Sequence, residues 1–151
     1  MPLSTDQDPH MTTLNLALAR TLIDAALASA HAKGFKPMGV VVVDAAAQVV
    51  ASARDDGATA LRLDIALGKA AAAVGMGVNS RVLAQRAKDV PAFFNTLAQA
   101  SLQKFIPQTG AVLITDAGGR VIGAAGASGG TGDEDEEIVI AGVAAAGLGH
   151  A

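Results

Sequence analysis

A chain of 151 residues has the size of one domain and is long enough to bury a hydrophobic core. Its 11 basic and 14 acidic residues give a net charge of −3, and only 3% of its residues are aromatic. This composition argues against a nucleic-acid-binding protein, which needs a basic surface and often stacking aromatic rings. The absence of cysteine excludes disulfides, thiolate metal sites and a cysteine nucleophile.

The hydrophobic content is high, at 51% of the residues, but no apolar run approaches the ~20 residues that a membrane span needs. We interpret the excess as the buried interface of a homo-oligomer; an alanine-rich core is the alternative. The N-terminus lacks the cationic start and apolar stretch of a secretory signal, so the expected location is cytoplasmic. Residues 1–11 differ in composition from the rest and are expected to be a disordered leader or tag, followed by a single domain at 12–151.

The first predicted elements are a helix and a hairpin. Thr12 or Thr13 can cap a helix in which apolar residues recur every four positions, and Gly34 stands at the expected stop. Strands follow near 38–44 and 48–54. The apolar run of the first strand does not alternate with polar residues, so we expect that strand to be covered on both faces.

Three helices, a second hairpin and a last helix complete the predicted order. A proline at position 91 suits a first helical turn. Residues 104–110 are predicted to form a loop or a short edge strand. The helices are predicted at about 59–75, 79–87, from 89 onward and 133–147, and the second pair of strands at 111–116 and 119–127.

The two predicted hairpins share one sequence pattern, at residues 41–51 and 113–123. In each, an apolar run leads to Asp44 or Asp116, then to a turn of small residues and a second apolar run. Asp favours such turns because its side chain can accept hydrogen bonds from the backbone just ahead of it. Hairpins make antiparallel pairs, so we predict an α/β fold of the α+β type, with one mostly antiparallel sheet and helices packed on it.

Several ordered motifs together resemble the GlcG/HbpS family, also called the haem-degrading or DUF336 family, and are similar to the C-terminal domain of PduO-type proteins. The resemblance covers about residues 12–148. It implies a profilin-like arrangement, homo-oligomeric assembly and, for some members, a connection to haem or other small ligands, but no single reaction. The motifs are Val42-Val43-Asp44, Arg54-Asp55-Asp56-Gly57-Ala58, Asp64-Ile65-Ala66 with Lys69-Ala70, Thr109-Gly110-Ala111, and residues 121–129 through to Asp135-Glu136.

The chain departs from this family pattern at two places. The turn that commonly reads Asp-x-Gly-Gly is intact at residues 116–119 but reads Asp-Ala-Ala-Ala at residues 44–47. The helix segment after Lys69 is all alanine, where relatives often carry threonine. Because of these alanines, we expect fewer polar groups near Lys69.

The candidate ligand-binding residues are Arg54, Asp55, Lys69, Ser128 and Gly129. Arg54 and Lys69 interrupt apolar segments, and such a pair of cations could bind the carboxylate of a haem propionate or an organic acid. The alternative is a structural salt bridge from either cation to Asp55 or to the aspartate at position 64. Gly129 belongs to a glycine loop ahead of the last helix, where backbone N–H groups can bind an anion. Close packing at this strand-to-helix corner is the alternative reading.

No metal site is predicted, although His31, Asp135 and Glu136 are the residues from which one could be built. Carboxylates suit Mg²⁺ or Ca²⁺, but an acidic start also stabilises a helix through its dipole. If haem is the cofactor, the chain offers no cysteine or tyrosine to its iron, and His10 and His150 stand near the ends, which leaves His31 and four methionines.

Three functions agree with these residues. The first is a small-molecule binding protein with haem or a related carboxylate-bearing ligand in an apolar pocket. The second is a cofactor-free isomerase, tautomerase or lyase that acts on a small organic acid, with Lys69 or Asp55 as the acid–base group. The third is an oligomeric assembly module without a ligand. The residues do not identify a substrate.

Overall fold

The computed structural model describes residues 12–102 and 104–151. The predicted leader at 1–11 lies outside these residues. None of the helices in the described part is long and apolar enough to cross a membrane. Over the same residues the elements are α1 (Leu16–Ala32), β1 (Gly39–Asp44), β2 (Val49–Arg54), α2 (Arg62–Met76), α3 (Ser80–Asp89), α4 (Pro91–Ala100), β3 (Ala111–Thr115), β4 (Val121–Ser128), α5 (Gly132–Ala145) and β5 (Gly149–His150).

The strands form one sheet in the order β2-β1-β4-β3-β5, and every neighbouring pair is antiparallel. The predicted α+β fold class is therefore confirmed. The sequence analysis missed β5, which pairs Gly149 and His150 with the end of β3. A glycine–histidine pair has little strand propensity, so this short strand depends on its contact with β3.

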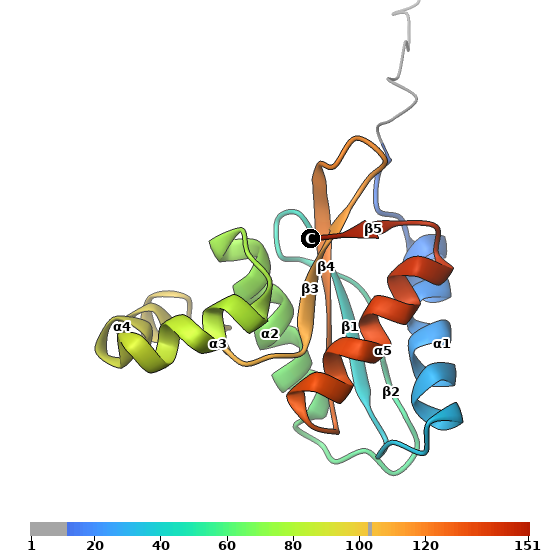
Figure 1. Ribbon diagram of the computed structural model, residues 1–151, viewed down its shortest axis with the longest axis horizontal. Helices are drawn as coiled ribbons and strands as arrows, with labels where there is room; N and C mark the ends of the chain where they lie inside the picture. Colours follow the sequence, from blue (N-terminus) through green and yellow to red (C-terminus); the bar gives the residue numbers. More distant parts are fainter. Residues whose placement is uncertain (1–11, 103) are drawn as a thin grey trace, which may run out of the picture.

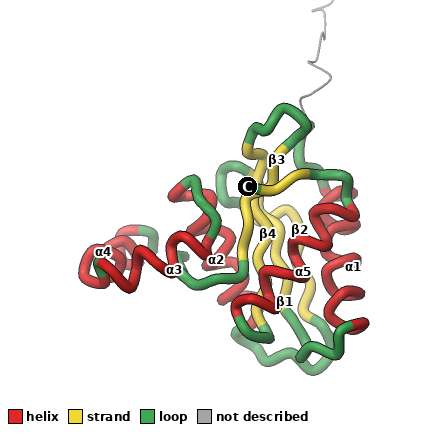
Figure 2. Tube along the Cα trace, in the orientation of Figure 1, coloured by secondary structure: helices red, strands yellow, loops and turns green. Residues whose placement is uncertain are grey.

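Helices cover both faces of the sheet (Figure 1). α1 and α5 pack side by side on one face, α2 lies on the other, and α3 and α4 extend from α2 away from the sheet (Figure 2). The interior strand β1 is buried almost throughout, as predicted for a strand covered on both faces. Its valines pack into two separate hydrophobic clusters, one on each face of the sheet.

Glycines in the central strands let α2 lie directly on the sheet. A Cβ atom on Gly126 of β4 would stand 2.5 Å from the carbonyl oxygen of Ala66, and one on Gly39 of β1 would stand 2.9 Å from the backbone of Arg62. Both distances are too short for a side chain, so the two glycines set the height of the helix above the sheet. This close approach places Lys69 of α2 against the end of β4.

The two hairpin turns have the predicted construction. The Oδ1 atoms of Asp44 and Asp116 each accept hydrogen bonds from the backbone N–H groups two and four residues further on. At the third residue after each aspartate the backbone is left-handed, with φ of 61° at Ala47 and 80° at Gly119. The first turn thus holds an alanine in a conformation that favours glycine.

The predicted cap of the first helix is wrong. Asn15, and not Thr12 or Thr13, caps α1, since its Oδ1 accepts a hydrogen bond of 2.9 Å from the N–H of Leu18. The helix ends as expected, with Gly34 in the left-handed conformation at φ 66°. All three side chains are acceptable N-caps, so residue type alone does not distinguish them.

Candidate functional site

An open cleft of about 460 Å³ lies between α2, the end of β4 and the start of α5. This volume is within the range of about 300–1,000 Å³ that is usual for small-molecule sites. Its walls combine buried charged groups with neutral polar side chains. The residues that line it are Arg62, Ile65, Lys69, Gln108, Thr109, Ser128, Gly130, Thr131, Gly132, Asp133 and Asp135.

A buried ion pair forms the floor of this cleft. The Nζ atom of Lys69 donates to Oδ2 of Asp135 at 2.9 Å and to the carbonyl oxygen of Ala127 at 3.1 Å. The sequence analysis named Asp55 and Asp64 as the partners of such a salt bridge, and this was wrong. Burial raises the pKa of the Asp135 carboxyl, and the hydrogen bond from Lys69 opposes that shift.

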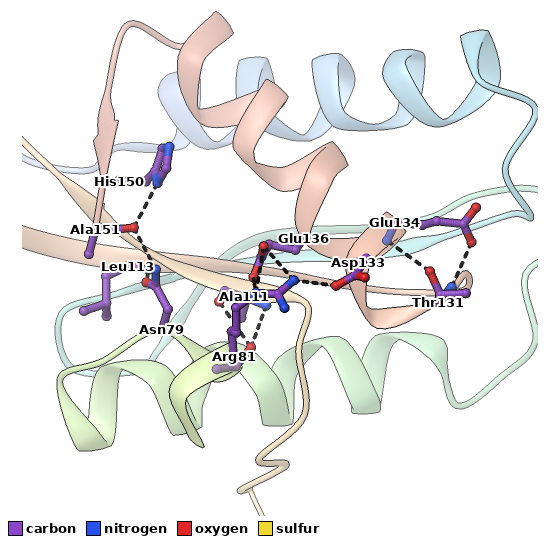
Figure 3. A network of polar contacts seen from close by, with 11 residues as sticks. Asn79, Arg81, Ala111, Leu113, Thr131, Asp133, Glu134, Glu136, His150 and Ala151 are labelled. Carbon is purple, nitrogen blue, oxygen red and sulfur yellow. Dashed lines mark hydrogen bonds and ion pairs between the residues drawn. The ribbon is translucent and has the colours of Figure 1, made fainter. Parts of the chain in front are cut away.

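The same aspartate fastens the glycine loop. Oδ1 of Asp135 accepts a hydrogen bond of 2.9 Å from the N–H of Gly130. Thr131 and Glu134 form a capping box at the start of α5, in which each side chain accepts a hydrogen bond from the other residue's N–H (Figure 3). Two N–H groups of the predicted anion loop, those of Gly130 and Thr131, are thus donated to side chains of α5.

Arg62, which the sequence analysis did not select, faces the cleft from the first turn of α2. Its Nη1 atom donates to Oγ of Ser128 at 3.2 Å, and the side chain is half-buried. A signal for it existed, because Arg62 and Lys69 are seven residues apart and so lie on one stripe of the helix. Ser128 itself is buried at the end of β4 and lines the cleft, as the sequence predicted for a pocket residue.

The structure does not bring Arg54 or Asp55 to the cleft. Arg54 is exposed at the end of the edge strand β2 and donates from Nη1 to the carbonyl oxygen of Ala58 at 2.6 Å. Asp55 pairs with His31, with 2.6 Å between Oδ2 and Nε2. The proposed cation pair of Arg54 and Lys69 is therefore wrong, and the two catalytic candidates, Lys69 and Asp55, have different partners.

Gly129 stands at a corner that leaves no room for a side chain. A Cβ atom there would lie 2.4 Å from the carbonyl oxygen of Pro37 and 2.8 Å from the sulfur of Met38. Close packing, the alternative that we stated for this glycine, explains its presence.

The three residues from which a metal site could be built are each held by a different partner. Asp135 bonds the lysine described above, His31 bonds Asp55, and both oxygens of Glu136 accept hydrogen bonds from Arg81 (Figure 3). Within residues 12–102 and 104–151, no group of three or more histidine, aspartate or glutamate side chains is arranged to hold a metal ion.

A second cleft, of about 450 Å³, lies at the opposite end of the sheet between the two hairpin turns. Oδ2 of Asp116 is buried there, has no hydrogen-bond partner among the described residues and lies 3.6 Å from Nε of Arg120. A hydrogen bond from the backbone of Arg120 is the main cause of a lowered pKa at Asp116. Oδ1 of this aspartate already serves its own turn, and we take the cleft at Lys69 as the candidate functional site.

Fold and site together define a small α+β domain with a polar cleft of ligand-binding size. The chain belongs to the HbpS-like family: the family model described as "Haem degrading protein HbpS-like" matches residues 14–144. The predicted resemblance is thereby confirmed. No curated protein gives a significant sequence match.

Solved structures agree with this assignment. The crystal structure of a PduOC:heme complex is 25% identical, with a TM-score of 0.81 over 91% of this chain and 98% of that one. The crystal structure of HbpS is 26% identical, with a TM-score of 0.76 over 95% of this chain and 97% of that one. The protein ORFY of Klebsiella pneumoniae, described as DUF336, is 22% identical with a TM-score of 0.79 over 94% and 96%, which shows a shared fold.

Proposed function

We propose that this protein binds a small molecule through a carboxylate that the cleft at Lys69 holds, the ligand being haem or a related acid. The observation that carries the proposal is the guanidinium of Arg62, which lies on the hydroxyl of Ser128 beside the buried ammonium of Lys69. Two cations and a hydroxyl that line one cleft are suited to a carboxylate.

Each of the three groups keeps hydrogen-bonding capacity for a ligand. Arg62 has five N–H donors, and one of them meets Ser128. The Ser128 oxygen accepts that bond, so its own O–H is available to donate. Lys69 has three donors, of which two are directed at Asp135 and a backbone carbonyl. These remaining donors are the groups through which we propose that the cleft binds a carboxylate.

The haem complex of PduOC is the support for haem as the ligand. The cleft fits one part of that molecule, because its cations suit a propionate. It does not fit the iron, because the residues that line the cleft include no histidine, methionine, cysteine or tyrosine. The cleft would therefore hold haem by a propionate alone.

We also propose that the protein is a homo-oligomer. The projecting helix α4 leaves Phe93 exposed, and Leu102 just after it is 84% exposed. Light scattering tests this assembly, because a monomer of this chain has a mass of 15.0 kDa. A monomeric mass at micromolar concentration would overturn it.

The binding proposal is tested by Arg62→Met, which keeps much of the apolar stem and removes the charge. Haem binding is followed by its absorbance and benzoate binding by calorimetry. A hydrogen bond to a charged group contributes about 1.5–3 kcal/mol, so the affinity should fall roughly 10- to 100-fold. Arg20→Met, at an exposed position on α1, is the matched control. Equal affinities of the wild type and Arg62→Met for both ligands would refute the proposal.

A further inference from the structure

We infer that the cleft accepts a single carboxylate and discriminates against a second negative charge, so that its ligands are small acids whose bound part is a monoanion. This inference rests on the proposed carboxylate site and deepens it. Its basis is the balance of charge within the cleft.

The charged residues that line the cleft cancel. Arg62 and Lys69 are positive, whereas Asp133 and Asp135 are negative. Asp135 neutralises Lys69 across 2.9 Å, and both side chains are more than nine-tenths buried. Among the described residues of the lining, Arg62 is thus the only cation that forms no ion pair, and it can balance one carboxylate.

The start of α5 adds no further capacity for anions. A free helix N-terminus attracts negative charge, but the first turn of this helix carries Asp133, Glu134 and Asp135. The carboxylate of Asp133 is 79% exposed and ion-paired with Arg81 at the rim (Figure 3). A ligand with a second carboxylate, or a phosphate dianion, would bring extra negative charge to this acidic rim.

The remaining wall is uncharged. Ile65 is half-buried, and Gln108 and Thr109 add neutral polar groups. This wall suits a neutral body attached to the carboxylate. A larger ligand with two carboxylates would place one at Arg62 and keep the other outside the cleft.

The test compares two ligands of the same ring that differ by one carboxylate. We expect benzoate to bind about fivefold more tightly than phthalate by calorimetry above neutral pH, since two like charges about 4 Å apart repel each other even in water. Inorganic phosphate should bind no better than phthalate. Equal or tighter binding of phthalate or phosphate would overturn the inference.

Asp133→Asn provides the second measurement. This residue is exposed, so its substitution leaves the core unchanged, and it removes one negative charge from the rim. We expect the preference for benzoate over phthalate to shrink several-fold in this variant; an unchanged preference would contradict the charge argument. If benzoate binds and depends on Arg62 but phthalate binds equally well, only the inference fails. If neither acid binds, or neither depends on Arg62, the proposed function fails with it.

Discussion

Replacement of Lys69 by methionine tests the buried ion pair. The substitution keeps the length of the side chain but removes the ammonium that donates to Asp135 at 2.9 Å and to a backbone carbonyl at 3.1 Å. The Asp135 side chain is 3% exposed, so its carboxylate would remain buried with only the N–H of Gly130 as a partner. Breaking one half of a buried pair costs about 3–5 kcal/mol.

That loss should be visible as a change in melting temperature. For a domain of this size 1 kcal/mol corresponds to about 2–4 °C, so we expect Lys69→Met to melt roughly 6–20 °C below the wild type. Thermal unfolding followed by circular dichroism measures it. Lys88→Met, an exposed position in α3, is the matched control and should change little.

The stability lost in Lys69→Met should also depend on pH, and the direction of this dependence follows from the pKa of Asp135. Burial already raises the pKa of this carboxyl, and removal of the ammonium raises it further. A folded state whose carboxyl pKa lies above the unfolded value binds the proton more tightly, so the variant gains stability as the pH falls through the raised pKa. The deficit of Lys69→Met should therefore be smaller at about pH 5 than at about pH 8.

A double variant separates the ion pair from packing. Lys69→Met combined with Asp135→Leu removes both charges, and apolar replacements of a whole buried pair are often neutral or stabilising. We expect the double variant to recover most of the lost melting temperature. Wild-type melting of Lys69→Met, with no effect of pH, would refute the reasoning.

Three further predictions concern the packing of α2, the first hairpin turn and haem. Gly126→Ala should destabilise the fold by about 1–3 kcal/mol in urea unfolding, because the new Cβ would stand 2.5 Å from the Ala66 carbonyl. Gly75→Ala is the control: no atom lies within 4 Å of its Cβ, so it should instead stabilise α2 by about 0.5–1 kcal/mol. Ala47→Gly should stabilise by roughly 0.5–1 kcal/mol in the same assay, since relief at φ 61° exceeds the added freedom of the unfolded chain; lower stability would count against strain in this turn. His31→Ala should leave the Soret spectrum of added haem unchanged, because His31 bonds Asp55 and is not part of the cleft; loss of a sharp six-coordinate spectrum would identify it as a ligand.

Local rules were enough to predict most elements from the sequence. Asp44 and Asp116 specify their turns through hydrogen bonds to residues two and four positions away. Pro91 begins α4 as predicted, and Gly34 ends α1. These interactions span a few residues, so composition and spacing contain the information they need.

Local rules could not predict which residues line the cleft, because these residues are far apart in the sequence. Lys69, selected because it interrupts an apolar helix, and Ser128 both line the cleft. Arg54 was selected because it ends a strand in an apolar segment, and Arg62 was not selected. The sheet places that strand at an edge, where Arg54 is exposed.

The sequence by itself determined the helices, the two hairpins, the antiparallel class of the sheet and the position of Lys69 in an apolar helix. Only the tertiary structure decided that Lys69 meets Asp135, 66 residues away, and that Arg62 meets Ser128, also 66 residues away. It also decided that β5 exists, through pairing with β3. The physical reason is that such contacts depend on the order of the strands and on how closely α2 packs on them, and glycines in β1 and β4 set that distance.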